Sequence, residues 1–393
     1  MRGSVVLIAA AVVLAGCASH EGAHGGTPPA EATAPSETHS SAHSAPTTAT
    51  AALEAGAGER IVTVAVPTDF APQAPAGATD EYRCFVVDPG VAEDVMITGT
   101  EFQPGNPAIV HHSILFAATP EQVPAAEELD AADPEPGYEC FGGAMLPARG
   151  GVLAGLDESD WITAWAPGGD ANELPTGYGM ELPEGGRIVI QMHYNLRSEQ
   201  GVDNTAVRLR VSAKKLKPLR TMLLPAPVEL PCAPGETGRL CDRTDAVDDV
   251  VSRFGADSGA TIAGLQLLCG GDPDDPQASS VQTCDRPVAK DAKVFAVAGH
   301  MHLLGREISV TLNPGTPGEK TLLDIENWDF DQQGAIPLDK PVDVGPGDTL
   351  RVKCRHDATL RSQLPALQGT PARYVVWGEG TTDEMCLAIL LNG

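Results

Sequence analysis

The chain has 393 residues and a formal net charge of −27, from 53 acidic and 26 basic side chains. This acidity repels nucleic acid and anionic lipid head groups, which argues against nucleic-acid binding and against membrane contact through surface charge. The 42 glycines and 33 prolines predict many turns, as in folds of short strands.

The first 17 residues have the pattern of a lipoprotein signal. Arg2 precedes an apolar run from Val5 to Val13, and the run ends in the lipobox sequence Leu-Ala-Gly-Cys at Cys17. The run is too short for a permanent membrane span. We therefore expect lipid on Cys17 to anchor an exported protein to a membrane. Because Ala18 follows the cysteine, the expected location in a Gram-negative cell is the outer membrane, at its periplasmic face or the cell surface.

Residues 18–58 are rich in Ala, Ser, Thr, Pro, Gly and Glu and have almost no large apolar side chains. Such a segment cannot bury enough apolar surface to offset the entropy of ordering it. The composition predicts a disordered tether between the lipid anchor and the folded protein.

From Arg60 onward, short runs of alternating apolar residues are separated by Pro/Gly turns. This pattern predicts an all-β fold of antiparallel β-sandwiches of the jelly-roll kind. About 330 residues are too many for one small sandwich, so we expect two, over 59–217 and 218–393. Within the second, residues 231–286 are an insertion. We expect a loop-rich lobe there, held by two local disulfides whose pairing among Cys232, Cys241, Cys269 and Cys284 stays open.

Four short motifs carry the residues of chemical interest. They are IVHHSILF with His111 and His112, VIQMHYN with His193, GHMHLLG with His300 and His302, and TTDEMC with Met385. Imidazole is a common ligand for copper, zinc and iron, and a thioether selects Cu(I).

The order and spacing of these motifs resemble the copper type II ascorbate-dependent monooxygenases, the family of dopamine β-monooxygenase and peptidylglycine α-hydroxylating monooxygenase. That family has a His pair, a lone His, His-x-His, and a Met beside a Cys. The likeness runs from about Tyr82 to Leu391 and is weakest from about Val228 to Arg286. It implies two β-sandwich domains, two copper ions with one on each domain, and ascorbate or a similar reductant as co-substrate.

The resemblance also implies individual roles. His111, His112 and His193 would hold the copper that delivers an electron, and Tyr82 and Gln191 match positions near it. His300, His302 and Met385 would hold the copper at which dioxygen and a small-molecule substrate react. The implied disulfides are Cys84–Cys140 and Cys354–Cys386, the second fixing the backbone beside Met385.

Strand geometry adds two conditions. Residues i and i+2 of a strand share a face, so His300 and His302 can converge on one ion. Neighbours face opposite sides, so His111 and His112 can share an ion only at a bulge. His356 lies in a polar sequence outside the motifs, and we expect it to be exposed.

The chain departs from the peptide-amidating members at two positions. They have an arginine where this chain has Ala298, and a tyrosine where it has Ile389; both hold a peptide carboxylate. Their absence removes charge-assisted bonds and indicates a small, apolar or weakly polar substrate. We therefore expect a C–H-hydroxylating copper monooxygenase. The alternatives are a non-catalytic copper-binding or copper-storage lipoprotein, and a zinc hydrolase that uses the three-histidine site.

Overall fold

The computed structural model describes residues 52–75, 78–147, 152–157, 159–166, 169, 171–197 and 199–393. The predicted signal, the lipidation site Cys17 and the tether up to residue 51 lie outside them. Strands make up most of the regular structure, so the all-β class is confirmed. None of the helices among the described residues combines the length and apolar character that a membrane span requires.

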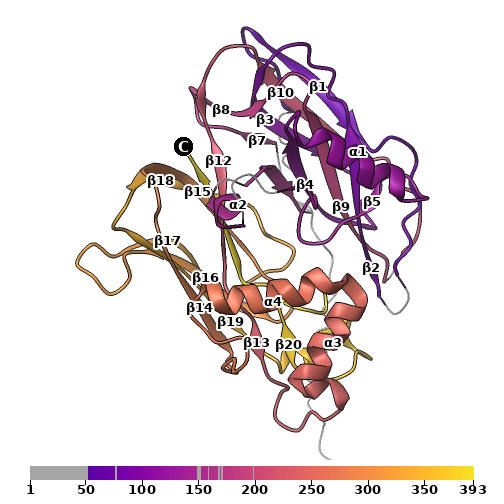
Figure 1. Ribbon diagram of the computed structural model, residues 1–393, viewed down its shortest axis with the longest axis vertical. Coiled ribbons are helices and arrows are strands. Elements are labelled where there is room, and N and C mark those ends of the chain that lie inside the picture. Colours follow the sequence, from indigo (N-terminus) through magenta and orange to yellow (C-terminus); the bar gives the residue numbers. More distant parts are fainter. Residues whose placement is uncertain are drawn as a thin grey trace, which may run out of the picture. The chain divides into compact units, whose positions relative to one another are not determined.

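Two mainly antiparallel sheets form the first half of the chain (Figure 1). The first has the order β1 (Glu59–Ala65), β10 (Ala206–Ser212), β3 (Val95–Gln103), β8 (Tyr178–Leu182) and β11 (Lys217–Pro218), with β7 (Asn172–Glu173) beside β3. The second has the order β5 (Tyr138–Glu139), β2 (Asp80–Val87), β9 (Arg187–Asn195), β4 (Val110–Ala118) and β6 (Trp161–Trp165). Alternate residues Val207 and Leu209 of β10 are buried in one core with Ile188 and Ile190 of β9. The period-two pattern of the strands thus gives each sheet an apolar face.

Two further sheets form the second half. One has the order β12 (Arg220–Pro225), β21 (Leu387–Asn392), β15 (Ala292–His300) and β18 (Ile336–Val344). The other has the order β14 (Val281–Pro287), β19 (Thr349–His356), β16 (Gly305–Leu312) and β17 (Lys320–Ile325). The short strands β13 (Glu229–Leu230) and β20 (Val375–Val376) form a separate pair. Val294 and Val297 of β15 share a second core with Val310 and Val352.

The insertion at 231–286 is helical, so the expectation of a loop-rich lobe was wrong. Its elements are η1 (Arg239–Cys241), α3 (Arg243–Phe254) and α4 (Ala256–Leu268). The side chain of Asp242 caps α3 by accepting hydrogen bonds from two backbone amides of its first turn. Ala246, Val250 and Phe254, spaced four residues apart, form its buried face. The remaining helical segments are α1 (Val123–Ala132), α2 (Val152–Asp157), α5 (Leu360–Gln363) and η2 (Pro365–Leu367).

Four disulfides link cysteines of the described residues. Cys84 pairs with Cys140 and Cys354 with Cys386, as the resemblance implied. The pairing that sequence left open is Cys232–Cys241 and Cys269–Cys284, two local loops in the insertion. Disulfides on this scale indicate an exported protein that folds in an oxidising compartment.

The predicted tether extends too far. Leu53 is 1% exposed, and its backbone N–H donates to Glu101 of β3 over 3.2 Å. Leu53 therefore packs on the first sheet, because it is the one large apolar side chain in a polar segment and is buried in the core.

Candidate metal centre

A β-bulge in β4 brings the neighbouring histidines His111 and His112 to one side. In the pairing of β4 with β9, Val110 lies opposite Tyr194 and His112 lies opposite His193, with a register shift between these pairs. The extra residue in β4 breaks the strict alternation of faces. The geometric condition for an adjacent histidine pair to share one ion is therefore met.

The three imidazoles converge through the same ring atom. The distances between Nδ1 atoms are 3.2 Å from His111 to His112, 3.3 Å from His111 to His193, and 3.1 Å from His112 to His193. A tetrahedral ion at about 2.0 Å from each nitrogen would separate the nitrogens by about 3.3 Å. The donor set and its spacing therefore fit a transition-metal ion.

The protonation state also suits a metal. Burial lowers the pKa of His111 to about 4. Burial and the facing imidazoles hold the pKa values of His112 and His193 well below the ordinary value. All three rings are neutral at pH 7, which is the form that binds metal ions.

His193 is oriented from behind by residues of both halves of the chain. Its Nε2–H donates to Asp80 Oδ1 over 2.9 Å, which leaves Nδ1 as the free ligand atom. The Thr381 hydroxyl donates to the same carboxylate oxygen over 2.7 Å. The Tyr82 ring stacks on His193 with a centroid distance of 4.1 Å, and its hydroxyl donates to the Glu379 carbonyl over 2.6 Å.

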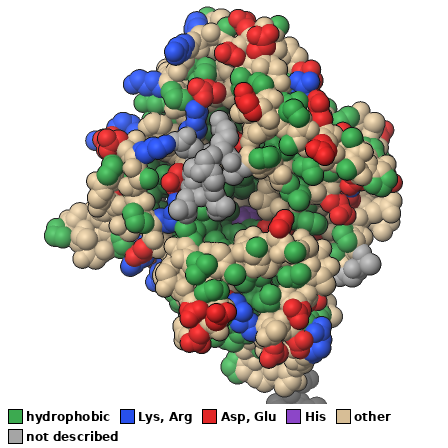
Figure 2. Space-filling view, in the orientation of Figure 1, with side chains coloured by type: hydrophobic (Ala, Val, Ile, Leu, Met, Phe, Trp, Pro, Cys, Tyr) green, Lys and Arg blue, Asp and Glu red, His purple; other side chains and the backbone are tan. Residues whose placement is uncertain are grey.

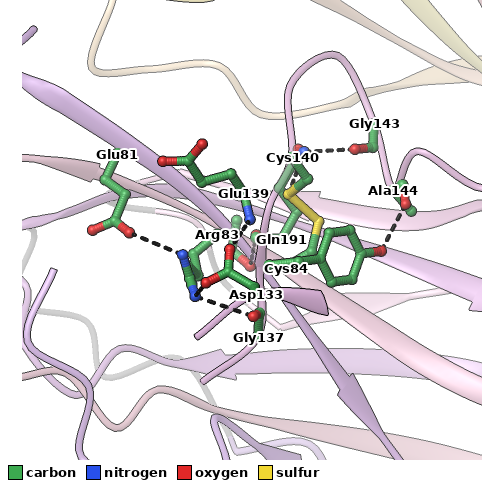
Figure 3. The surroundings of a disulfide bond; sticks show 12 residues. Glu81, Arg83, Cys84, Asp133, Gly137, Glu139, Cys140, Gly143, Ala144 and Gln191 are labelled. Atoms are coloured by element: carbon green, nitrogen blue, oxygen red, sulfur yellow. Dashed lines mark hydrogen bonds and ion pairs between the residues drawn. A yellow bond between two sulfur atoms is a disulfide. The ribbon is translucent and has the colours of Figure 1, made fainter. Parts of the chain in front are cut away.

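Gln191 lies on β9 two residues before His193, but its amide is engaged elsewhere. Its Nε2 donates to the Gly143 carbonyl over 3.1 Å and contacts Cys140 Sγ (Figure 3). On the other side of the disulfide, Arg83 forms an ion pair with Asp133 and donates to Gly137. The structure therefore places Tyr82 against a candidate ligand and Gln191 against the disulfide loop 137–144.

The second histidine pair stands where β15 ends. His300 is the last residue of the strand, and His302 lies two residues later, so the predicted strand ends before the pair's second member. His300 Nδ1–H donates to Gln333 over 2.6 Å, and His302 Nδ1–H donates to the Asp383 carbonyl over 3.3 Å. His302 Nε2 is buried without a hydrogen-bond partner. Both rings therefore have Nε2 available to a metal ion, and for His302 an ion would satisfy a buried polar atom.

One buried carboxylate ties the His302 turn to the Met385 segment. Glu384 accepts hydrogen bonds from the backbone amides of His302 over 2.9 Å and of Met385 over 3.2 Å. Although burial opposes ionisation, hydrogen bonds from His356 and these amides hold the pKa of Glu384 below its usual value. The Cys354–Cys386 disulfide fixes the next residue, and Met385 is 7% exposed. Imidazole and thioether are the donor types that suit a soft metal ion such as Cu(I).

His356 is 1% exposed, so the expectation of a solvent-exposed residue was wrong. Its Nε2 lies 3.2 Å from the Met385 carbonyl and 3.3 Å from Glu384. It ends β19, whose disulfide to the Met385 segment brings it into the core beside Glu384. No pattern in the polar sequence around it indicated this position.

The two histidine clusters adjoin. The rings of His112 and His300 have a centroid distance of 5.8 Å. Phe330, from the loop between β17 and β18, stacks on His111 at 4.6 Å and meets His302 edge-on at 6.3 Å. Figure 2 shows histidine at the floor of a hollow with hydrophobic side chains around it.

Four residues that support the clusters were not predicted from the sequence: Phe330, Gln333, Asp80 and Glu384. Only Glu384 had a local signal, because it stands directly before Met385 in the motif DEMC.

Comparisons with known proteins agree with this picture. Residues 279–391, which include His300, His302 and Met385, match the model of the copper type II ascorbate-dependent monooxygenase C-terminal domain. DBH-like monooxygenase protein 1 of Homo sapiens is 23% identical over 295 residues, covering 74% of this chain and 40% of that protein. The Gallus gallus protein of the same name is 23% identical over 289 residues, covering 72% of this chain and 39% of that protein. The chain thus spans about two fifths of the length of these relatives.

Proposed function

We propose, from the premise that this chain is a member of the copper type II ascorbate-dependent monooxygenase family, that it is a two-copper enzyme that hydroxylates a C–H bond of a small organic substrate. The observation that carries the proposal is that the convergent three-histidine group adjoins the histidine pair of the second half, through the ring contact of His112 with His300. The balanced reaction takes the substrate, dioxygen, two electrons and two protons to the alcohol and water. Ascorbate or another one-electron reductant would supply the electrons.

In this proposal the residues divide the work. His111, His112 and His193 would hold one copper ion, with Asp80 keeping His193 in the right tautomer. His300, His302 and Met385 would hold the other, with Glu384 joining the backbones of His302 and Met385. When bound, the two ions supply one-electron redox chemistry, and the thioether favours Cu(I) in the second site.

Two apolar residues lie close to His300 in the sheet. Ala298 shares a strand face with His300, and Ile389 lies directly opposite Ala298 in the pairing of β15 with β21. The two positions that would carry carboxylate-holding groups in an amidating enzyme are therefore neighbours and both hydrocarbon. We propose a small apolar or weakly polar substrate, and little turnover of benzoyl-glycine.

The test is metal analysis of the copper-loaded protein combined with ascorbate-driven oxygen uptake over a panel of small molecules. We expect two copper ions per chain, and uptake that rises with an apolar substrate and matches the mass of a hydroxylated product. Two copper ions without turnover would favour a copper-storage protein. Tight zinc in the three-histidine site with hydrolytic activity would favour a zinc hydrolase.

We further propose that the two pairs of sheets are two β-sandwich domains, 59–217 and 218–393, and that lipid on Cys17 anchors the protein to a membrane. The disulfides support export, and the signal-like first 17 residues support the lipid. Cys17→Ser should release the protein into the soluble fraction, because lipid chains contribute about 0.8 kcal/mol per buried methylene. A variant that stays with the membrane after a high-salt wash would contradict the anchor.

A further inference from the structure

The carboxyl end of α3 carries an arginine that binds the motif around Met385. Arg253 forms a two-pronged salt bridge with Asp383, with both nitrogen–oxygen distances at 2.7 Å. The side chain of Asp383 is 2% exposed, and that of Arg253 is 13% exposed. A planar guanidinium bound in this way sets the orientation of its carboxylate as well as its position.

Asp383 in turn orders the backbone next to the candidate ligands. Its carboxylate accepts the backbone N–H of Gly380 over 3.1 Å, and its carbonyl accepts Nδ1–H of His302 over 3.3 Å. A Cβ atom added at Gly380 would lie 3.1 Å from Phe254 and 3.3 Å from Arg253, so this turn is fitted closely to the helix end. The orientation of His302 thus depends on a carbonyl whose residue is held by the two-pronged Arg253 pair, with Arg373 donating one further hydrogen bond to the carboxylate over 3.1 Å.

The adjacent residue of α3 reaches toward the other histidine cluster. Phe254 packs edge-on against Phe141 at a centroid distance of 5.0 Å, and Phe141 lies 5.8 Å from the ring of Tyr82. Tyr82 stacks on His193. Phe141 follows Cys140, whose disulfide fixes the loop. Two consecutive residues at the end of one helix therefore touch the supports of both clusters.

We propose that the helical insertion 231–286 is a positioning element for the thioether metal site, with Arg253 as its positioning residue. Helices α3 and α4 precede residues 279–391, so this support lies outside the residues that match the family model. The local disulfides Cys232–Cys241 and Cys269–Cys284 brace the insertion at both ends. The inference rests on the proposed function, because it requires that His302 and Met385 bind copper.

The experiment uses the full-length protein loaded with Cu(I). Two quantities are measured: the sulfur contribution to the copper X-ray absorption spectrum, which reports the Met385 site alone, and Cu(I) affinity by chelator competition. We expect Arg253→Gln to lower affinity at the sulfur-containing site by about 10- to 100-fold, as loss of an outer partner does at other metal sites. The three-histidine site should keep its affinity. Arg253→Lys should recover only part of the lost Cu(I) affinity, because an ammonium keeps the positive charge but cannot form the two parallel hydrogen bonds of a guanidinium.

Arg239→Gln is the matched control. Arg239 lies in the same insertion and pairs with Asp245, but its side chain is 66% exposed and the pair is away from Asp383. We expect wild-type values from this variant. An Arg239→Gln loss equal to that of Arg253→Gln would overturn the proposal, as would a folded Arg253→Gln protein with an unchanged sulfur signal.

A second variant covers the case in which Arg253→Gln does not fold. Arg253→Met combined with Asp383→Asn removes both charges of the pair, and Arg373 keeps its ion pair with Asp249. The proposal predicts the same selective loss of the sulfur-containing site, and wild-type affinity in this variant would overturn it. A wild-type protein without any copper–sulfur signal would instead show that the proposed function itself is wrong.

Discussion

The two histidine clusters present similar metal-binding side chains, but different structural elements hold them in place. The three-histidine cluster stands on paired strands, where the register of β4 against β9 and one bulge bring its three Nδ1 atoms within 3.3 Å of one another. The cluster of His300, His302 and Met385 stands on a strand end, a turn and a distant segment. The Glu384 carboxylate, the Asp383 carbonyl and the Gln333 amide hold these pieces together. The comparison indicates that a strand ladder can preorganise one site while the other depends on the polar groups that surround it.

Met385→Ala should have the largest effect. The thioether is one of the proposed donors at the oxygen-reacting site, so its loss should lower hydroxylation by more than about a hundredfold, beyond the effect of losing an outer partner. The fold and the three-histidine copper should remain. Oxygen uptake and the Cu(II) spectrum measure both. Full activity in this variant would show that Met385 is not a ligand.

Glu384→Gln tests whether one carboxylate holds the second cluster together. An amide cannot accept from every backbone N–H that Glu384 now satisfies, so we expect unfolding to become easier by about 2–4 kcal/mol. Urea denaturation of the metal-free protein measures this. Glu307→Gln is the control, since its ion pair with Arg355 is at the surface and should contribute less than about 1 kcal/mol. Equal effects of the two variants would contradict the assigned role.

Asp80→Asn and Gln333→Ala form a matched pair, one outer partner for each cluster. Asp80→Asn should lower copper affinity at the three-histidine site by about 10- to 100-fold, since an amide can hold His193 in the wrong tautomer. Gln333→Ala should lower affinity at the other site, where it holds His300. Chelator competition on each variant measures the two affinities. Loss at both sites from either change would mean that the clusters are one coupled unit.

Acid should destabilise the metal-free protein through both clusters. Burial lowers the pKa of His111 to about 4 and that of His300 to about 3, below the unfolded value of about 6.5. As pH falls below about 6.5 the unfolded chain binds more protons, so stability is full above that pH and is lost toward pH 4. Each histidine contributes about 1.4 kcal/mol per pH unit in this window. A urea midpoint that stays constant from pH 7 to pH 4.5 would refute the neutral buried rings.

The sequence predicted that strands dominate the fold and named the candidate ligands, because both leave local signals. Alternating apolar residues predicted strands such as β15, and the spacing of four histidine and methionine motifs predicted the donor sets. The first helix of the insertion also has a local signal in the sequence. Asp242 is a typical helix cap and Gly255 a typical helix end, and between them Ala246, Val250 and Phe254 recur every four residues.

By itself, then, the sequence determined which side chains can bind a metal and that strands dominate the fold. Only the tertiary structure decided which ring nitrogen of each histidine is free, that His356 is buried, and that Arg253 reaches the Met385 segment. Asp80 and Thr381 meet across 301 residues, and Arg253 and Asp383 across 130. Such contacts follow from how sheets pack and register, and no short-range pattern of residue types encodes them.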